Sequence, residues 1–408
     1  MIIRSITSFI SLKSIEEFSA DVLTRLQEAS ARLKDHLNRA GYSVQSSRLA
    51  TNSFTEYMPL NNPDLVVQQA QLMESVSLQA GFDYLSLGPA QAELKNSYDL
   101  IPRIFQDTNH VFLTGNLTTK KREIDLYAVR MCANIVATIA DYDPNGFKNL
   151  YFSAIANVPG GIPFFPSAYQ DKAGVGFALA MEAADLAVTA FNKASTLKDA
   201  RENYIKAVES AAQGINAVMK PIVDLLGIEF YGFDMTPGPF IVNERSAGSA
   251  LELLGLPQVG QHGSLAASAF LMDALDQAEF QRSGFNGLML PILEDNVLAK
   301  RVEEGALTLK DLLLMSAVCG TGLDTVPVPG STSIDEIAAV LLDVASLSLR
   351  LRKPLTARLM PIPGKAAGEL TTFDFPFFTN TRVMAIESSG LSGLLGGSEK
   401  YLIHPKYK

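Results

Sequence analysis

The residues most able to do chemistry gather in the stretch 260–324. It holds one of the four histidines, one of the two cysteines, an acidic pair and a cluster of glycines. These residue types supply nucleophiles, general acids and bases, and metal ligands, and here they fall at the expected ends of helices and strands. The sequence therefore predicts a candidate site in this stretch but does not specify a reaction.

Cys319 is the candidate nucleophile. It follows an apolar helical pattern and precedes Gly320 and Gly322, which allow the backbone to approach a ligand closely and its amides to form an anion-binding nest. A thiolate stabilised there would act as a nucleophile or a radical relay. The alternative is a free cysteine that only fills the core, and base rates favour it.

His262 lies between two glycines and directly before an Ala-rich helical pattern. The positive end of a helix disfavours a cation, so a neutral imidazole suited to acid–base chemistry is expected. An imidazole that merely caps its own helix is an equally good interpretation. Together with Asp324, these residues form our candidate catalytic set: Cys319, His262 and Asp324.

Several carboxylates lie at expected strand ends. Glu294 and Asp295 follow one strand, and Asp234 and Asp324 lie at others. Carboxylates gathered at one place suit Mg²⁺ or Ca²⁺ better than Zn²⁺, so Glu294, Asp295 and Asp234 are the expected metal ligands. The competing interpretation is that acidic residues in a first helical turn complement the helix dipole.

Two loops bear on ligand binding. The segment 363–369 contains Lys365 but lacks the first glycine and the final Ser or Thr of a Walker A loop, so Lys365 is either an anion ligand or a solvated turn lysine. The segment 159–166 holds three prolines and two adjacent glycines, which exclude regular structure. Its aromatic residues either line a pocket or plug one end of the core.

Alternating helical and strand patterns predict an α/β fold with a mainly parallel sheet. Long helices are expected over 174–194 and 197–226. The whole chain, 1–408, is expected to form a single domain with a Gly/Ser-rich tail from about 390. About ten strands are expected, over 2–10, 44–51, 82–87, 110–115, 150–158, 228–235, 287–293, 323–328, 355–362 and 382–387.

The overall composition makes some classes of protein, such as nucleic-acid-binding and membrane-spanning proteins, less expected. The 408 residues are 47% hydrophobic and 19% charged, with a formal net charge of −9, which disfavours nucleic-acid binding. No apolar run is long enough to span a membrane. Two cysteines suggest a reducing compartment, so we expect a cytoplasmic protein. We further expect a small-molecule ligand and a homodimer formed through the Ala-rich helices.

The segments 260–263, 291–295, 319–324 and 361–365 resemble the uncharacterised family called domain of unknown function 711, or uncharacterised protein family 0210. Asn157 and Pro163-Phe164 extend the resemblance into the first half of the chain. It implies a ten-stranded α/β barrel like that of pyruvate formate-lyase and anaerobic ribonucleotide reductase, built from two five-stranded parallel halves. Gly320, Gly322, Lys365 and Asn157 are then the candidate ligand-binding residues.

The resemblance also bears on radical chemistry. In the glycyl-radical enzymes a C-terminal Arg-Val-x-Gly loop carries the radical, and the nearest text here is Arg382-Val383-Met384-Ala385. Alanine stands where glycine is required, so no glycyl radical is expected. Three hypotheses remain. The first is a non-radical enzyme with its site inside the barrel, and the second is a non-catalytic protein that binds a small anion or nucleotide there. The third is an interaction or structural role, supported by the apolar composition and the Ala-rich helices.

Overall fold

The computed structural model describes residues 2–318 and 320–406, and its centre is a nine-stranded sheet ordered β8-β7-β1-β2-β3-β4-β6-β10-β9. Its strands are β1 (Ile2–Ile10), β2 (Ser43–Thr51), β3 (Tyr84–Ala90), β4 (Val111–Asn116), β6 (Phe152–Ala156), β7 (Val175–Glu182), β8 (Glu229–Asp234), β9 (Gly322–Pro329) and β10 (Leu355–Ile362). A small second sheet pairs β5 (Glu123–Asp125) with β11 (Lys400–Leu402).

Strand direction divides the sheet into two sets. The five strands β1, β2, β3, β4 and β6 are mutually parallel. At one flank β7 and β8, and at the other β10 and β9, run the opposite way. The fold is therefore a mixed α/β fold with a mostly parallel central sheet, as the alternating sequence pattern predicts.

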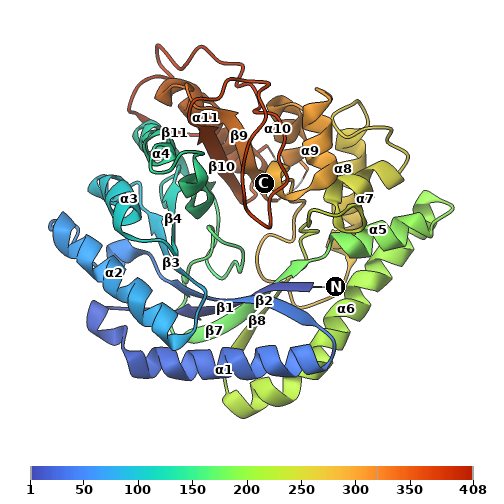
Figure 1. Cartoon of the computed structure of the whole chain (residues 1–408), viewed down its shortest axis with the longest axis horizontal. Coiled ribbons are helices and arrows are strands. Elements are labelled where there is room, and N and C mark those ends of the chain that lie inside the picture. The colour runs from blue at the N-terminus through green and yellow to red at the C-terminus, as the bar shows by residue number, and fades with distance from the viewer. Residues whose placement is uncertain (1, 319, 407–408) are drawn as a thin grey trace.

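The helices cover one face of this sheet. The strands β1 to β6 follow one another in chain order, and right-handed crossovers then place the intervening helices on the same side. Figure 1 shows the helices on the outside and the strands toward the middle. Their bounds are α1 (Ala20–Arg39), α2 (Pro63–Ala80), α3 (Asn96–Asp107), α4 (Leu126–Ala140), α5 (Ala184–Asn192), α6 (Leu197–Leu226), α7 (Ala247–Leu253), α8 (Ser264–Gln277), α9 (Asn296–Glu303), α10 (Leu309–Ser316) and α11 (Ile334–Leu351).

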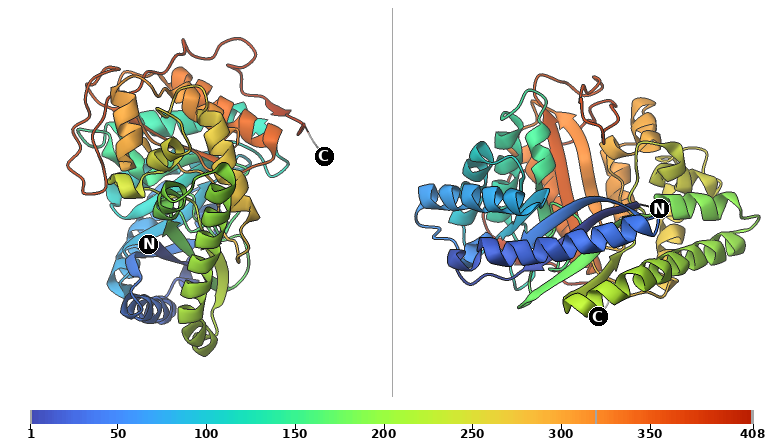
Figure 2. Two further views of the ribbon diagram at one scale, coloured as in Figure 1. Left: turned by 90° about the vertical axis from the view of Figure 1, so that its right-hand side faces the viewer. Right: turned by 60° about the horizontal axis from the view of Figure 1, so that its bottom comes forward.

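The helix face carries the main hydrophobic core. On α1, Leu26, Leu33 and Leu37 recur at helical spacing and bury against strand residues such as Ile6 and Leu49. The long helices α1 and α6 pack against each other, and Figure 2 shows them side by side. In the part of the chain that the structure describes, no helix is both long and apolar enough to cross a membrane.

The opposite, inner face of the sheet is covered by the connection between β6 and β7, residues 157–174, hereafter the central loop. It lies in the middle of the molecule in Figure 1. Thr7 Oγ1 donates to Pro163 O at 2.8 Å and Ser86 Oγ donates to Ala168 O at 2.6 Å, so two strands hold the loop. Two of its own residues, Phe164 and Phe165, are buried.

Three predicted elements differ from the structure. The helix expected over 174–194 is strand β7 followed by the short helix α5. The segment Val175–Glu182 is rich in alanine, which favours helices, but its pairing with β1 and its burial against the central loop override that local preference. The strand expected over 382–387 is an irregular segment with a single bridge between Leu370 and Arg382.

The strand expected over 287–293 is also irregular, yet it lies beside both edges of the sheet. Isolated parallel bridges join Phe233 of β8 to Arg282, and Asp324 of β9 to Pro291. The backbone around Arg282 exchanges hydrogen bonds with Phe233, at 2.8 Å and 2.9 Å. Residues 282–291 thus run between the two edge strands without forming a regular strand.

Candidate functional site

Six buried or partly buried charged side chains form a continuous chain on the inner face of the sheet. Arg4 Nη1 lies 3.0 Å from Glu294 Oε2, and Arg358 Nη2 lies 3.3 Å from Glu294 Oε1. Arg358 also donates to Asp324 Oδ1 at 2.5 Å, and Arg4 donates to Glu182 Oε1 at 3.4 Å. We call this set the arginine–carboxylate chain; in order it is Arg245, Glu182, Arg4, Glu294, Arg358 and Asp324.

Irregularities in the strands aim these side chains. The β1–β7 register shifts between Ile3 and Ser5, the position of Arg4. The β9–β10 register shifts between Ala357 and Leu359, the position of Arg358. A β-bulge re-aims a side chain, and bulges are frequent beside active sites. Both arginines therefore enter the inner space at places where the ladder is interrupted.

The backbone of Thr325, next to Asp324, is strained. Its φ is 40°, a left-handed value that a β-branched residue rarely adopts, and it directly follows Asp324. Such strain persists only where the surrounding structure enforces it, and it concentrates at functional sites. The strained turn fixes Asp324 against Arg358.

The electrostatics of Asp324 reflect two opposing effects. Burial raises the pKa of its carboxyl above the ordinary value, and the positive charge of Arg358 opposes that rise. Glu294, a second carboxylate on the same guanidinium, also raises the pKa of Asp324. Asp324 therefore holds its proton more readily than an exposed aspartate does.

This chain forms one wall of a cavity of about 300 Å³, hereafter the arginine pocket. The volume lies at the small end of the range for ligand sites. Aromatic rings from the central loop, from the strands and from 375–377 form the rest of the wall. The lining residues are Arg4, Gln45, Ser46, Arg48, Asp83, Tyr84, Phe112, Leu150, Phe164, Phe165, Met289, Glu294, Asp324, Arg358, Phe375 and Phe377.

Arg48 of β2 is the cation of this pocket that lacks a carboxylate. Its Nε donates to Ser46 Oγ at 3.0 Å, and its guanidinium lies 5.3 Å from the ring centre of Phe165 and 5.8 Å from that of Tyr84. Within residues 2–318 and 320–406 it forms no ion pair. Burial, followed by the charge of Arg4, lowers the pKa of Arg48 to about 10, so it remains a cation near neutral pH.

The predicted carboxylates separate into two groups. Glu294 and Asp324 meet at Arg358 in the arginine pocket. Asp295 instead caps α9, accepting from Val297 N at 2.9 Å and Ser246 Oγ at 2.6 Å. Asp234 likewise accepts hydrogen bonds from backbone amides and a hydroxyl, which come from Thr236, Phe285 and Asn286.

The remaining predicted site residues lie elsewhere. His262 is exposed at the start of α8, and Lys365 lies in a turn where its backbone amide donates to Ile362 O at 3.1 Å. Gly322 begins β9 against Thr356, and the backbone of Gly320 lies close to Gly287. Asn157 begins the central loop and lines a second, polar cavity. Cys319 falls outside the residues that the structure describes.

The three expected metal ligands, Glu294, Asp295 and Asp234, do not come together in the structure. Across the described residues, no group of three or more His, Cys, Asp or Glu side chains is arranged to hold a metal ion. The oxygens of Glu294 face arginines, while those of Asp295 and Asp234 accept the hydrogen bonds given above. Sequence adjacency therefore does not bring Glu294 and Asp295 to one site.

The arginines were missed by the sequence analysis, although a signal for them exists. Arg4, Arg48 and Arg358 each stand inside a segment that reads as a buried strand. An ionised side chain is almost never fully buried without a partner, so an arginine within such a strand predicts buried carboxylates or a ligand. That rule would have pointed to this face of the sheet.

Comparison with known proteins agrees with the resemblance seen in the sequence. The family model described as "Uncharacterised ACR (DUF711)" matches residues 1–380. A UPF0210 protein of Pyrobaculum aerophilum is 28% identical over 381 residues, covering 88% of this chain and 82% of that protein. One from Oleidesulfovibrio alaskensis is 26% identical over 430 residues, covering 98% and 92% respectively. The chain therefore belongs to the uncharacterised DUF711 family, also called UPF0210.

Proposed function

We propose that this protein binds a small organic anion in the arginine pocket, with the anionic group on Arg48 and an apolar or aromatic group against the phenylalanines. The observation that carries the proposal is Arg48 itself. It is a cation without an ion-pair partner in the described parts of the chain, and it lines an aromatic-walled cavity. A planar guanidinium suits bidentate recognition of a carboxylate or phosphate.

The neighbouring charges explain why Arg48 would take up the ligand. In the arginine–carboxylate chain, three arginines face three carboxylates, so these charges are already balanced. Arg48 adds a positive charge to the buried part of the pocket, where Arg4 repels it. The remaining lining carboxylate, Asp83, is exposed to solvent and accepts a hydrogen bond from Ser47 N. A bound anion would neutralise that charge in a partly desolvated place, where ionic interactions are strong.

The binding test uses isothermal titration with benzoate, phenylpyruvate and phenyl phosphate. Arg48→Met should weaken binding by roughly 10- to 100-fold, the worth of a charge-assisted hydrogen bond, and Arg48→Lys should fall between. Arg103→Met is the matched control, because Arg103 is exposed on α3 and its ion pair among the described residues is with exposed Asp64. Equal affinities for the Met variant and the wild type would reject the proposal.

A second candidate function is acid–base catalysis on the same ligand. It is favoured by Asp324, a buried carboxyl with a raised pKa that lines the pocket beside the strained Thr325. Asp324 would accept or return a proton at the bound molecule. Deuterium incorporation into phenylpyruvate in heavy water, followed by NMR, tests this role. If Asp324→Asn incorporated deuterium at the same rate as the wild type, Asp324 would have no role in proton transfer.

We also propose that residues 282–291 close the sheet into a ten-stranded barrel with five strands in each direction. The two isolated bridges support this, since they link the segment to β8 and to β9 in the parallel sense. A fold related to that of pyruvate formate-lyase and anaerobic ribonucleotide reductase would follow. A cytoplasmic location and a homodimer belong to the same proposal, supported by two cysteines in 408 residues and by the Ala-rich helices.

A further inference from the structure

A second cavity, of about 630 Å³, lies on the other side of the central loop, at the carboxyl ends of the five parallel strands. We call it the strand-end pocket. Ser11 follows β1, Asn52 follows β2, Gln91 follows β3, Asn116 ends β4 and Asn157 follows β6, and all five line it. In open parallel sheets, ligands bind outside the carboxyl ends of the strands. The position of this cavity is therefore that of a ligand site.

The inner part of the strand-end pocket is polar. Asn116 and Asn157 are half-buried and Thr118 is buried, with 8% of its surface exposed. The side chains of these three residues form no hydrogen bond to another residue in 2–318 or 320–406, although the backbone of Asn116 accepts from Tyr98 Oη and that of Thr118 bridges to Ile124. Each side chain carries both donor and acceptor capacity, and all three residues line the pocket.

Asn157 is held in an unusual conformation. Its φ is 53°, in the left-handed region, directly after the last residue of β6. Asparagine tolerates this conformation better than most residues, and glycine tolerates it best. The strained backbone therefore places an amide at this strand end where a straight continuation of β6 would not.

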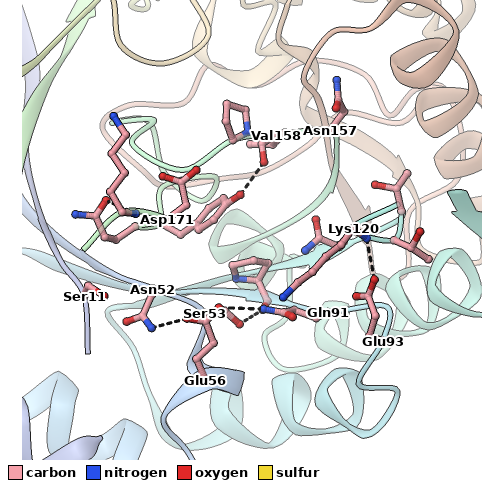
Figure 3. A pocket seen from close by; sticks show the side chains of 18 of the residues that line it. Ser11, Asn52, Ser53, Glu56, Gln91, Glu93, Lys120, Asn157, Val158 and Asp171 are labelled. Carbon is pink, nitrogen blue, oxygen red and sulfur yellow. Dashed lines mark hydrogen bonds between the residues drawn. The ribbon is translucent and has the colours of Figure 1, made fainter. Parts of the chain in front are cut away.

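The rim of the pocket carries charges of both signs. Figure 3 shows Glu56, Gln91 and Lys120 in the lower part of the view and Asp171 above them. The exposed rim charges sum to zero, and none forms an ion pair with any described residue: Lys120, Arg122, Lys172, Glu56, Glu93 and Asp171. A strongly charged ligand would gain little net attraction from such a rim.

We propose that the strand-end pocket binds a small neutral polyhydroxylated molecule of about the size of a monosaccharide. Each hydroxyl of such a ligand both donates and accepts, as do the amides and the hydroxyl of Asn116, Asn157 and Thr118. A zwitterion would instead require buried charges of opposite sign, and here the charged groups lie at the exposed rim. The volume falls within the range of ordinary ligand pockets.

The test titrates the full chain with D-glucose, D-ribose and myo-inositol, observed by saturation-transfer NMR and quantified by calorimetry. Thr118→Val removes the hydroxyl at nearly constant volume, and Asn157→Gly removes the amide while keeping the left-handed backbone. Each should weaken polyol binding by roughly five- to tenfold, the worth of one or two hydrogen bonds. Thermal unfolding of both variants establishes that they remain folded.

The controls separate this site from the arginine pocket. Arg48→Met should leave polyol binding unchanged, whereas it weakens binding of aromatic carboxylates under the function proposed above. Glycine and glutamate serve as zwitterionic and anionic comparators. The inference is overturned if no polyol binds at saturating concentration, if the amino acids bind in place of the polyols, or if Thr118→Val and Asn157→Gly bind polyols as the wild type does.

Discussion

At the scale of single residues, Arg358 contacts two carboxylates of the arginine–carboxylate chain, as Arg4 also does. Arg358 contacts Glu294 and Asp324, and all three side chains are about nine-tenths buried. Removing one partner of a buried ion pair leaves an uncompensated charge, which costs far more than the pair itself contributes. The stability of this part of the sheet therefore depends on keeping these charges together.

Arg358→Met should lower the free energy of unfolding by about 3–5 kcal/mol, because both carboxylates lose a cation. The double variant Arg358→Met, Asp324→Asn should recover part of that loss, since Glu294 retains Arg4. Urea unfolding monitored by circular dichroism measures both changes. If Arg358→Met were as stable as the wild type, the ion pairs of Arg358 with Glu294 and Asp324 would have to be open to solvent.

Asp324 should also make stability depend on pH. Burial raises the pKa of Asp324 in the folded protein, so the folded chain holds this proton at pH values where the unfolded chain has lost it. The stabilisation is complete below the unfolded pKa and is lost as pH rises through the folded pKa. Melting temperatures of wild type and Asp324→Asn, compared across this range, should diverge with the variant gaining relative stability at higher pH. Parallel curves would contradict the raised pKa.

Residue types alone pointed to two carboxylates of the arginine pocket and to none of its arginines. Glu294 and Asp324 were expected at strand ends, and they do share Arg358. The other two predicted carboxylates, Asp295 and Asp234, have other roles, because a helix cap and a loop anchor require the same acidic residues as a site does. The arginines come from β1, β2 and β10, and only the folded sheet brings these strands together.

At the scale of elements, Gly322 determines how closely β9 approaches β10. Its φ is +99°, and a Cβ there would lie 2.2 Å from Thr356 O. Gly322→Ala should therefore destabilise the protein by about 1–3 kcal/mol through forced displacement of β10. Gly364→Ala is the matched control, since Gly364 has a φ of +74° but nothing within 4 Å of its Cβ. Thermal unfolding measures the loss of stability in both variants. Equal losses would contradict the prediction, because they would be explained by the positive φ that both glycines share and not by contact with Thr356.

The helices and strands also show where local sequence patterns are enough to predict an element. The helix over 197–226 was predicted at its observed bounds, and the structure shows a cap at each end, Thr196 and Gly227. Strand β7 was mistaken for a helix, because its partner β1 is more than 160 residues away and local sequence cannot report that pairing. The segment 282–291 likewise lacks the regular pattern of a strand.

At the scale of the whole molecule, the seam between β8 and β9 should be its weakest part. The segment 282–291 joins these edges by two isolated bridges, whereas the other neighbouring strands share ladders of three or more residue pairs. Amides at 288–290 should exchange with heavy water faster than those of β1 and β2, because local opening there breaks few hydrogen bonds. Exchange mass spectrometry measures both regions in one experiment. Equal protection would indicate a seam as firmly bonded as the rest of the sheet.

The central loop forms part of the wall of both cavities, Phe164 and Phe165 toward the arginine pocket, and Val158 and Tyr169 toward the strand-end pocket. The two pockets thus share one partition. A ligand on one side that favours one position of this partition must change the affinity on the other side, and the factor is the same in both directions. The protein has two chemically different pockets with a common wall. Through that wall, the binding of one compound can respond to the presence of the other.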